Sequence, residues 1–361
     1  MQKSGLQWCK CDKIRIFYDK ILIASLHLPL YPARIWIMLR FHLRVVYLFF
    51  LCCAGLMASG QRVDHFSTFR TLETNHYFRF HYDNDYFTAT DKYYTQGITV
   101  EYLSPVINRF LPARLLLKPF SSIPRYGISL NLFGYTPTSI SSDAILYGDR
   151  PFDANLSLKI FLVQADSLHQ QQLSSAISLG VMGPAALGKE IQTGIHRLTK
   201  NILPHGWEFQ VSNDIILNYQ LNYEKKLTGI RDYFLLNSVG ELRLGTLDDK
   251  ISTGFNFMAG RFNKRYQLAG KQKRKAAYYL FGQGRINFTA YDASLQGGLF
   301  NRSSPYTIPA KDITRVSFQA DAGLILNFKK IFLSYTQSFL SKEFSSGKQH
   351  RWGGLSVGFS L

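Results

Sequence analysis

Apolar and polar residues alternate in short stretches from about residue 77 to the last residue of the chain. Tyr94 begins an apolar face between residues 94 and 102, whereas Thr95, Gly97, Thr99 and Glu101 share the opposite face. A period of two residues is that of a β-strand with one apolar and one polar side. The pattern therefore predicts a chain built mostly from strands.

We expect twelve strands, at residues 77–85, 94–104, 125–135, 154–165, 171–182, 209–226, 230–245, 250–262, 277–290, 313–328, 330–342 and 350–361. Beyond residue 60 no apolar run is long enough for a membrane helix, and 15% of the residues are aromatic. Alternation of lipid-facing and lumen-facing side chains is typical of transmembrane β-barrels, and an even strand number returns both ends to the periplasm. The sequence thus predicts an all-β, twelve-stranded antiparallel transmembrane β-barrel in the bacterial outer membrane.

One stretch, residues 183–207, has the spacing of a helix instead. The apolar residues that recur there at intervals of four, four and three are Leu187, Ile191, Ile195 and Leu198. Pro184 suits the first turn, and we expect the apolar face to pack against the barrel. Because this helix follows the fifth predicted strand, barrel topology places it at the extracellular rim.

Residues 1–60 contain all four cysteines of the chain. From Met38 onward, two arginines precede a short apolar core and then Ala58, Ser59 and Gly60, which is the layout of a secretory signal peptide. We expect an upstream extension with a signal at about residues 38–60, followed by the barrel over residues 61–361. Removal of the signal would leave no thiol, which excludes a disulfide framework and a cysteine metal site.

The formal net charge is +18, and the basic residues are scattered over strands and turns without a recognised nucleic-acid-binding motif. We therefore expect no nucleic-acid partner. Arg150 and Lys189 are expected near the same rim as the helix. A solvated charged rim is the ordinary interpretation, but cationic side chains there also suit the phosphate groups of an anionic lipid.

Acidic and amide side chains gather where the first predicted strand ends and the second begins. Asp83, Asn84 and Asp85 close the first strand, and Asp91 and Thr95 open the second. A hairpin would bring them side by side, and carboxylate and amide oxygens are ligands that Ca²⁺ prefers. The same residue types are common in plain turns, which is the alternative interpretation.

His196 is expected at the same rim, with Gln192 one helical turn before it to hold the ring. A neutral imidazole near a cation can take a proton from water while the cation polarises a carbonyl, which is the chemistry of ester hydrolysis. No Gly-x-Ser-x-Gly motif indicates a serine nucleophile. A solvent-exposed helix histidine is the alternative.

Two long motifs, DNDYF…TDKYYTQG at residues 83–97 and GPAALGKEIQTGIHRL…GW at residues 183–207, resemble the outer-membrane lipid A 3′-O-deacylase family of the LpxR type. The resemblance covers about residues 75–361 and implies calcium-dependent removal of the 3′-linked acyloxyacyl group of lipid A. By motif position, it implies that the active-site residues are Asn84, Asp85, Thr95, Gln192 and His196.

Two positions depart from the family pattern. Ile202 stands six residues after His196, where a family member carries an acid, and Tyr86 replaces a second aspartate after Asp85. Either change would weaken metal binding or shift the ligands to Asp83 or Asp91. The rival interpretations are an outer-membrane phospholipase and a barrel without chemistry, such as a pore or surface protein. We expect a membrane-embedded monomer.

Overall fold

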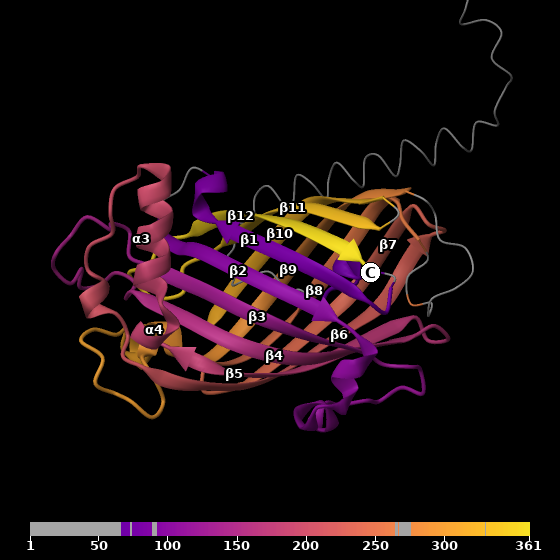
Figure 1. Cartoon of the computed structure of the whole chain (residues 1–361), viewed down its shortest axis with the longest axis horizontal. Helices are drawn as coiled ribbons and strands as arrows, with labels where there is room; N and C mark the ends of the chain where they lie inside the picture. The colour runs from indigo at the N-terminus through magenta and orange to yellow at the C-terminus, as the bar shows by residue number, and fades with distance from the viewer. Residues whose placement is uncertain (1–65, 73, 89–91, 264–265, 267–275, 329) are drawn as a thin grey trace, which may run out of the picture. The chain divides into compact units, whose positions relative to one another are not determined.

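The computed structural model describes residues 66–361, except for residues 73, 89–91, 264–265, 267–275 and 329. Twelve antiparallel strands close into a barrel in which each strand pairs with the next in sequence and β1 pairs with β12 (Figure 1). The predicted barrel and its strand number are confirmed. The predictions for residues 1–60 lie outside the described residues. No helix in the described part of the chain has the length and apolar character needed to cross a membrane.

The strands are β1 (Tyr77–Asn84), β2 (Tyr93–Leu103), β3 (Arg125–Thr136), β4 (Asp153–Asp166), β5 (Gln171–Met182), β6 (Asp214–Ile230), β7 (Phe234–Gly245), β8 (Asp248–Arg261), β9 (Ala276–Asp292), β10 (Val316–Phe328), β11 (Ile331–Leu340) and β12 (His350–Ser360). The helices are α3 (Gly188–Thr199) and α4 (Ala293–Gln296), and the 3-10 turns are η1 (Thr68–Arg70), η2 (Asp85–Thr88), η3 (Pro105–Arg109), η4 (Leu111–Leu115), η5 (Pro184–Ala186), η6 (Trp207–Phe209) and η7 (Ala310–Asp312). Every strand boundary lies within five residues of its predicted position.

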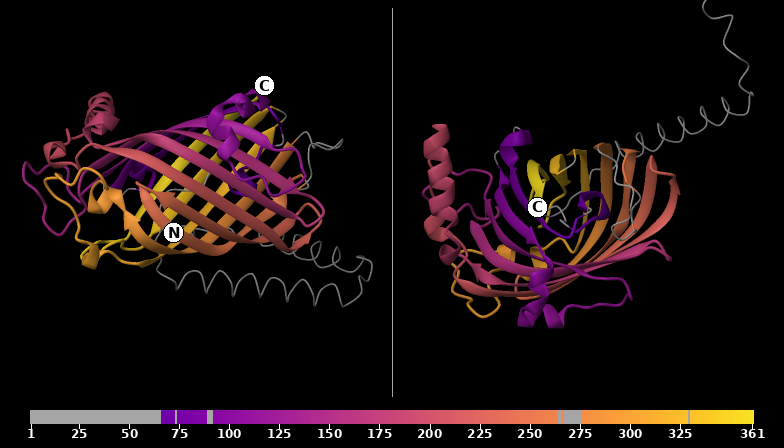
Figure 2. Two further views of the ribbon diagram at one scale, coloured as in Figure 1. Left: turned by 90° about the horizontal axis from the view of Figure 1, so that it is seen from below. Right: turned by 45° about the vertical axis from the view of Figure 1, so that its right-hand side comes forward.

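The two ends of the barrel differ in their connections. Helix α3 and the longer connections at residues 137–152, 183–213 and 293–315 lie at one end, and the C-terminus lies at the other (Figures 1 and 2). At the C-terminal end, two of the fully described connections are tight turns, at residues 167–170 and 231–233. Among the connections at this end whose residues are all described, the one at residues 104–124 is much longer, and it carries η3 and η4.

Side chains alternate between the outer wall and the lumen as the sequence pattern predicts. On β1, Phe78 and Phe80 are exposed on the outer wall, while Arg79 and His81 are buried in the lumen. On β12, Gly354 leaves room in the lumen, because a Cβ atom there would lie 2.1 Å from Oδ1 of Asp83. The polar face is therefore buried inside the barrel, where its members bond to one another.

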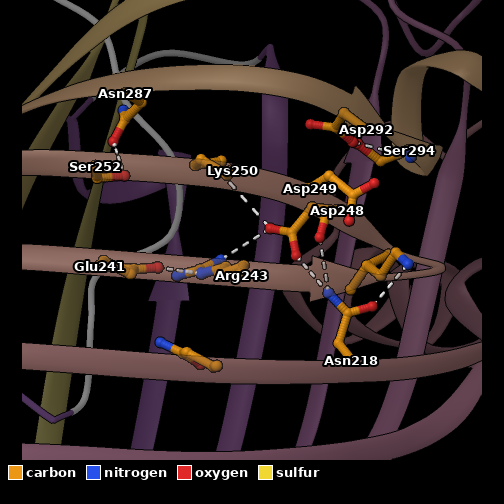
Figure 3. A network of polar contacts seen from close by, with 12 residues as sticks. Asn218, Glu241, Arg243, Asp248, Asp249, Lys250, Ser252, Asn287, Asp292 and Ser294 are labelled. Carbon is orange, nitrogen blue, oxygen red and sulfur yellow. Dashed lines mark hydrogen bonds and ion pairs between the residues drawn. The ribbon is translucent and has the colours of Figure 1, made fainter.

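A network of charged and amide side chains lines the lumen face of the neighbouring strands β6 to β9 (Figure 3). Glu241 accepts hydrogen bonds from Arg243 and Arg285, and Arg243 also reaches Asp248 at 3.1 Å. Asp248 in turn accepts a hydrogen bond from the amide of Asn218 at 2.7 Å. A cavity of about 60 Å³ lies beside this network. These pairs compensate the buried charges that a polar lumen would otherwise leave without partners.

The segment before β1, residues 66–72, lies inside the barrel (Figure 2). The Phe69 ring stacks on Phe281 with 4.2 Å between ring centroids. The backbone amide of Thr68 donates to Glu224 of β6 at 3.0 Å, and Arg70 donates to Thr336 of β11 at 3.1 Å. Strands on several sides of the lumen thus hold the segment, near the end of the barrel where the C-terminus lies.

Candidate functional site

Helix α3 is shorter than the predicted helical stretch. Pro184 opens the 3-10 turn η5, and Leu187 then adopts a left-handed conformation with φ of 60° before the helix begins at Gly188. At the other end, Lys200 is again left-handed, with φ of 55°, and ends the helix. The remainder of residues 183–207 forms turns around this short helix.

The buried face of α3 is not its apolar stripe. Gly188, Gln192 and His196, each one turn from the next, are the buried residues, whereas Leu187 and Leu198 are 50% and 87% exposed. The predicted packing of the apolar face is therefore wrong. The physical reason is a close approach at Gly188, where a Cβ atom would lie 2.4 Å from the Cβ atom of Ala154.

A chain of hydrogen bonds joins the hairpin to the helix. The Asn84 side-chain amide donates to the backbone carbonyl of Thr95 at 2.7 Å, and also to the Tyr82 hydroxyl. The Gln192 amide donates to the Thr95 hydroxyl at 2.9 Å, and its carbonyl accepts from the indole N–H of Trp207 at 2.7 Å. Asn84, Thr95 and Gln192, which are distant in sequence, therefore form one connected unit.

A β-bulge places Thr95 on the outer wall. The pairing of β2 with β3 shifts between Tyr94 and Gln96, so Thr95 is an extra residue in β2. Tyr94 turns into the lumen, where its ring packs against Trp352 with 5.0 Å between centroids. The prediction that Tyr94 faces outward and Thr95 inward is wrong, because a bulge reverses the alternation locally.

Two of the three predicted ligands at the end of β1 lie on opposite sides of the wall. Asp83 points into the lumen and contacts Nε2 of His81 at 2.6 Å, so it does not share a site with Asn84 on the outer wall. Asp85 lies in η2, where its carboxylate accepts from the backbone amide of Lys92 at 2.9 Å. The prediction for Asp83 is thus corrected, since neighbouring strand residues face opposite sides. Asp91 lies outside the described residues.

His196 is held in one orientation by a backbone contact and not by Gln192, which corrects the prediction. Both ends of the Gln192 side chain bond instead to Thr95 and Trp207. The Nδ1 atom of His196 bonds to the carbonyl oxygen of Ile202, the residue six positions later. A carbonyl only accepts, so Nδ1 carries the proton and Nε2 of the neutral ring is an acceptor. The backbone of Ile202 thereby supplies an acceptor where a family member has an acidic side chain.

The two predicted phosphate contacts lie in different surroundings. Arg150 is buried and bonds to Glu343 and to Ser294, with its guanidinium 3.7 Å from the centroid of the Tyr135 ring. Burial raises the pKa of Glu343, and the Arg150 charge opposes that shift. Arg150 is therefore not available at the surface of the rim, which corrects its prediction, whereas Lys189 is exposed on α3.

Two contributors were missed from the sequence. Trp207 is fully buried beside α3 and bonds to Gln192, and the carbonyl of Ile202 holds His196. Trp207 belongs to the Gly-Trp pair that ends the second motif, but the motif does not show that its partner is Gln192. The Ile202 contact could not be predicted, because every residue has a backbone carbonyl and the residue type does not show where it points.

The described part of the chain contains no group of three or more His, Cys, Asp or Glu side chains that could hold a metal ion. Three predicted site residues supply oxygen atoms: the Asp85 carboxylate, which accepts from the Lys92 amide, the Asn84 amide oxygen, which accepts from the Tyr86 amide, and the Thr95 hydroxyl, which accepts from Gln192. A calcium site accepts neutral oxygen ligands and water beside its carboxylates. The donor types therefore fit a hard cation, with one described carboxylate among them.

Comparison with protein families matches residues 46–361 to the family described as "Outer membrane protein LpxR". The chain belongs to the LpxR family. Among solved structures, LpxR from Salmonella typhimurium is similar with a TM-score of 0.64 and 17% sequence identity, over 79% of this chain and 100% of that one. The toluene transporter TodX from P. putida is less similar, with a TM-score of 0.35 and 10% identity over 81% of this chain and 91% of its own. No curated protein matches the sequence.

Proposed function

We propose that this outer-membrane protein is an ester hydrolase that removes the 3′-linked acyloxyacyl group from lipid A. The observation that supports the proposal most directly is the hydrogen-bonded unit of Asn84, Thr95 and Gln192, with His196 one turn further along the same buried helix face. These are the residues that the family resemblance implies. Their position on the outer wall suits a substrate that lies in the bilayer beside the barrel.

The site is assigned to the extracellular rim from the connections of the barrel. Short turns face the periplasm and long loops face outward in bacterial outer-membrane barrels. The described connections at residues 167–170 and 231–233 are tight turns at the C-terminal end, and α3 lies at the opposite end. The outer leaflet, where lipid A resides, is then level with His196.

In this mechanism, Nε2 of His196 accepts a proton from a water molecule as the water oxygen attacks the ester carbonyl. The tetrahedral intermediate collapses, the bond to the 3′ oxygen breaks, and the imidazolium returns its proton to that oxygen. The products are the free acyloxyacyl acid and a 3′-hydroxyl. The Ile202 carbonyl stabilises the transient imidazolium and fixes the orientation of the ring through Nδ1.

A calcium ion would be held by Asp85 together with Asn84 and Thr95, and it would polarise the ester carbonyl and stabilise the oxyanion. Gln192 orients the Thr95 hydroxyl, since its own carbonyl is already engaged by Trp207. Lys189 is exposed on α3 and provides a positive charge for a lipid A phosphate.

The decisive experiment is mass spectrometry of lipid A from cells that express the wild type, His196→Asn or His205→Asn. His205 is the matched control, because it is a half-exposed histidine in the same connection and pairs with Asp143. Wild type and control should remove the acyloxyacyl group, whereas His196→Asn should lower the rate by about 10²-fold or more. Equal hydrolysis by His196→Asn, or loss of phospholipid acyl chains instead, would contradict the proposal.

Calcium binding is tested without activity by thermal unfolding of the purified protein. Added Ca²⁺ should raise the Tm of the wild type, and a chelator should reverse the rise, because a ligand that binds only the folded state stabilises it. Asp85→Asn should abolish most of the shift, and Asp249→Asn, which alters a carboxylate at the β7–β8 turn, should keep it. Equal shifts in both variants would exclude Asp85 as a ligand.

A further inference from the structure

The connection between β2 and β3, residues 104–124, is unlike the tight turns at the same end of the barrel. It folds back along the outside of the wall, where its buried residues Ile107, Ala113 and Leu116 pack on Tyr126 and Leu162. The surface that they cover belongs to the lipid-facing wall. The connection is therefore continuous with the surface by which the barrel contacts the membrane.

Hydrogen bonds fix this connection, which we name the foot, to the outer wall. The Leu117 amide donates to the Tyr219 hydroxyl of β6 at 3.0 Å, and that hydroxyl donates to the Leu115 carbonyl at 3.3 Å. Ser175 of β5 donates to the Leu117 carbonyl at 3.2 Å. The foot is thus an ordered segment that packs on the outer faces of β3, β4, β5 and β6.

The exposed surface of the foot is largely apolar. Leu111 is 71% exposed and Ile123 is 73% exposed, and Val106, Phe110 and Leu115 are also exposed. A cluster of this kind on a soluble surface would be costly, since apolar area is driven out of water at about 25 cal/mol per Å². Next to a lipid-facing wall, the same side chains can enter the acyl region of the bilayer.

The charges of the foot have a single sign. Residues 104–124 contain Arg109, Arg114 and Lys118 and no acidic residue. All three basic side chains are exposed. Basic residues beside an inserted apolar face are attracted to anionic lipid head groups and bind them at the interface. In contact with a second copy of this foot, the same charges would repel each other.

We propose that the foot inserts into the periplasmic leaflet of the outer membrane, with its apolar side chains among acyl chains and Arg109 and Arg114 on anionic phospholipid head groups. It is a lipid-binding element at the end of the barrel opposite α3. The inference goes beyond the hydrolase proposal and does not depend on lipid A being cleaved.

Insertion is measured with an environment-sensitive fluorophore on a single cysteine. All cysteines lie in the first 60 residues, so serine at those four positions makes a label at Leu111→Cys unique. The control label is Leu168→Cys, which replaces an 83% exposed leucine in the β4–β5 turn at the same end of the barrel. In bilayers, lipids with brominated acyl chains should quench the Leu111 label strongly and the Leu168 label weakly.

Head-group preference is measured by native mass spectrometry of the reconstituted chain with mixed phosphatidylglycerol and phosphatidylcholine. Arg109→Gln with Arg114→Gln should lower the retained fraction of phosphatidylglycerol about fivefold or more. Arg231→Gln with Lys330→Gln, two exposed basic residues in turns at the same end, should leave it unchanged. Weak quenching at Leu111, an unaltered lipid preference, or dimers that shield the label would overturn the proposal.

Discussion

Gln192 connects the helix to the wall through both ends of one side chain. Its amide donates to Thr95 and its carbonyl accepts from Trp207, and both Gln192 and Trp207 are 1% exposed. A buried polar group that loses its partner costs more than the bond itself is worth, because no water replaces the partner. The effects of substituting Gln192 and Trp207 on the free energy of unfolding should therefore not be additive in a double-mutant cycle.

We expect Gln192→Leu to lower the free energy of unfolding by about 1–3 kcal/mol, because the Trp207 indole N–H loses its acceptor. Trp207→Phe should cost a similar amount. The double variant should recover at least half of the summed loss, because neither buried partner then remains, yet its hydrolytic rate should stay low without the bond to Thr95. Denaturant unfolding in micelles and the lipid A assay measure the two effects; strictly additive losses would refute the coupling.

Sequence reasoning predicted the members of the candidate site better than the side on which they lie. Asn84, Thr95, Gln192 and His196 follow from motif and helical spacing, and three of them are directly bonded in the structure. The sequence did not predict that Thr95 lies on the outer side of the wall. One extra residue in β2 reverses the alternation locally, and no sequence pattern indicated this bulge. Asp83 was assigned to the site because it precedes Asn84 directly in the sequence, whereas neighbouring residues of a strand face opposite sides of the wall.

At the scale of the element, the position of α3 depends on a glycine. A Cβ atom on Gly188 would lie 2.4 Å from Cβ of Ala154 and 2.7 Å from the Trp207 ring, whereas one on Gly194 would meet nothing within 4 Å. Replacing either glycine by alanine therefore makes the same chemical change on the same helix, but only the change at Gly188 produces a steric clash.

We expect Gly188→Ala to push α3 from the wall, to cost about 1–3 kcal/mol of stability and to reduce hydrolysis. Gly194→Ala should preserve activity and stabilise the protein by up to about 1 kcal/mol, since alanine favours the helix. Unfolding midpoints and lipid A mass spectra compare the two variants. Equal activity of both would show that α3 needs no close approach.

The strands could be predicted from the sequence because the period of two persists over long stretches. The main deviation is β6, which begins at Asp214 and not at residue 209, since Val211 donates its backbone amide to Phe152 outside the barrel ladder. The packing of α3 could not be predicted, because a stripe of large apolar residues indicated one face and small Gly188 made another approach the wall. The face of α3 that packs on the barrel is therefore set by how closely the helix can approach the wall, and not by its hydrophobicity.

At the scale of the whole molecule, the segment at residues 66–72 fills part of the lumen and is buried against strands on several sides. Thr68 bonds to Glu224, and Phe69 stacks on Phe281. A twelve-stranded barrel leaves only a narrow passage, which side chains of this size can close.

We expect the complete chain to give no steady conductance in planar bilayers. Deletion of residues 66–72 should produce discrete channel openings, because the lumen then loses Phe69 and its neighbours. The deletion should also lower thermal stability, since Glu224 loses a bond inside the barrel. Steady conductance of the complete chain would favour the rival pore function.

The bulge at Thr95 has a consequence for how such a protein can diversify. Pairing of β2 with β3 is regular on both sides of it, from Tyr93 opposite Thr136 and from Gln96 opposite Gly134 down to Leu103. One inserted amino acid thus supplies an outward hydroxyl while the rest of the ladder keeps its register. The outward hydroxyl and the integrity of the barrel are therefore separable at this position, and we expect a relative without the insertion to keep the barrel while losing this hydroxyl from its outer wall.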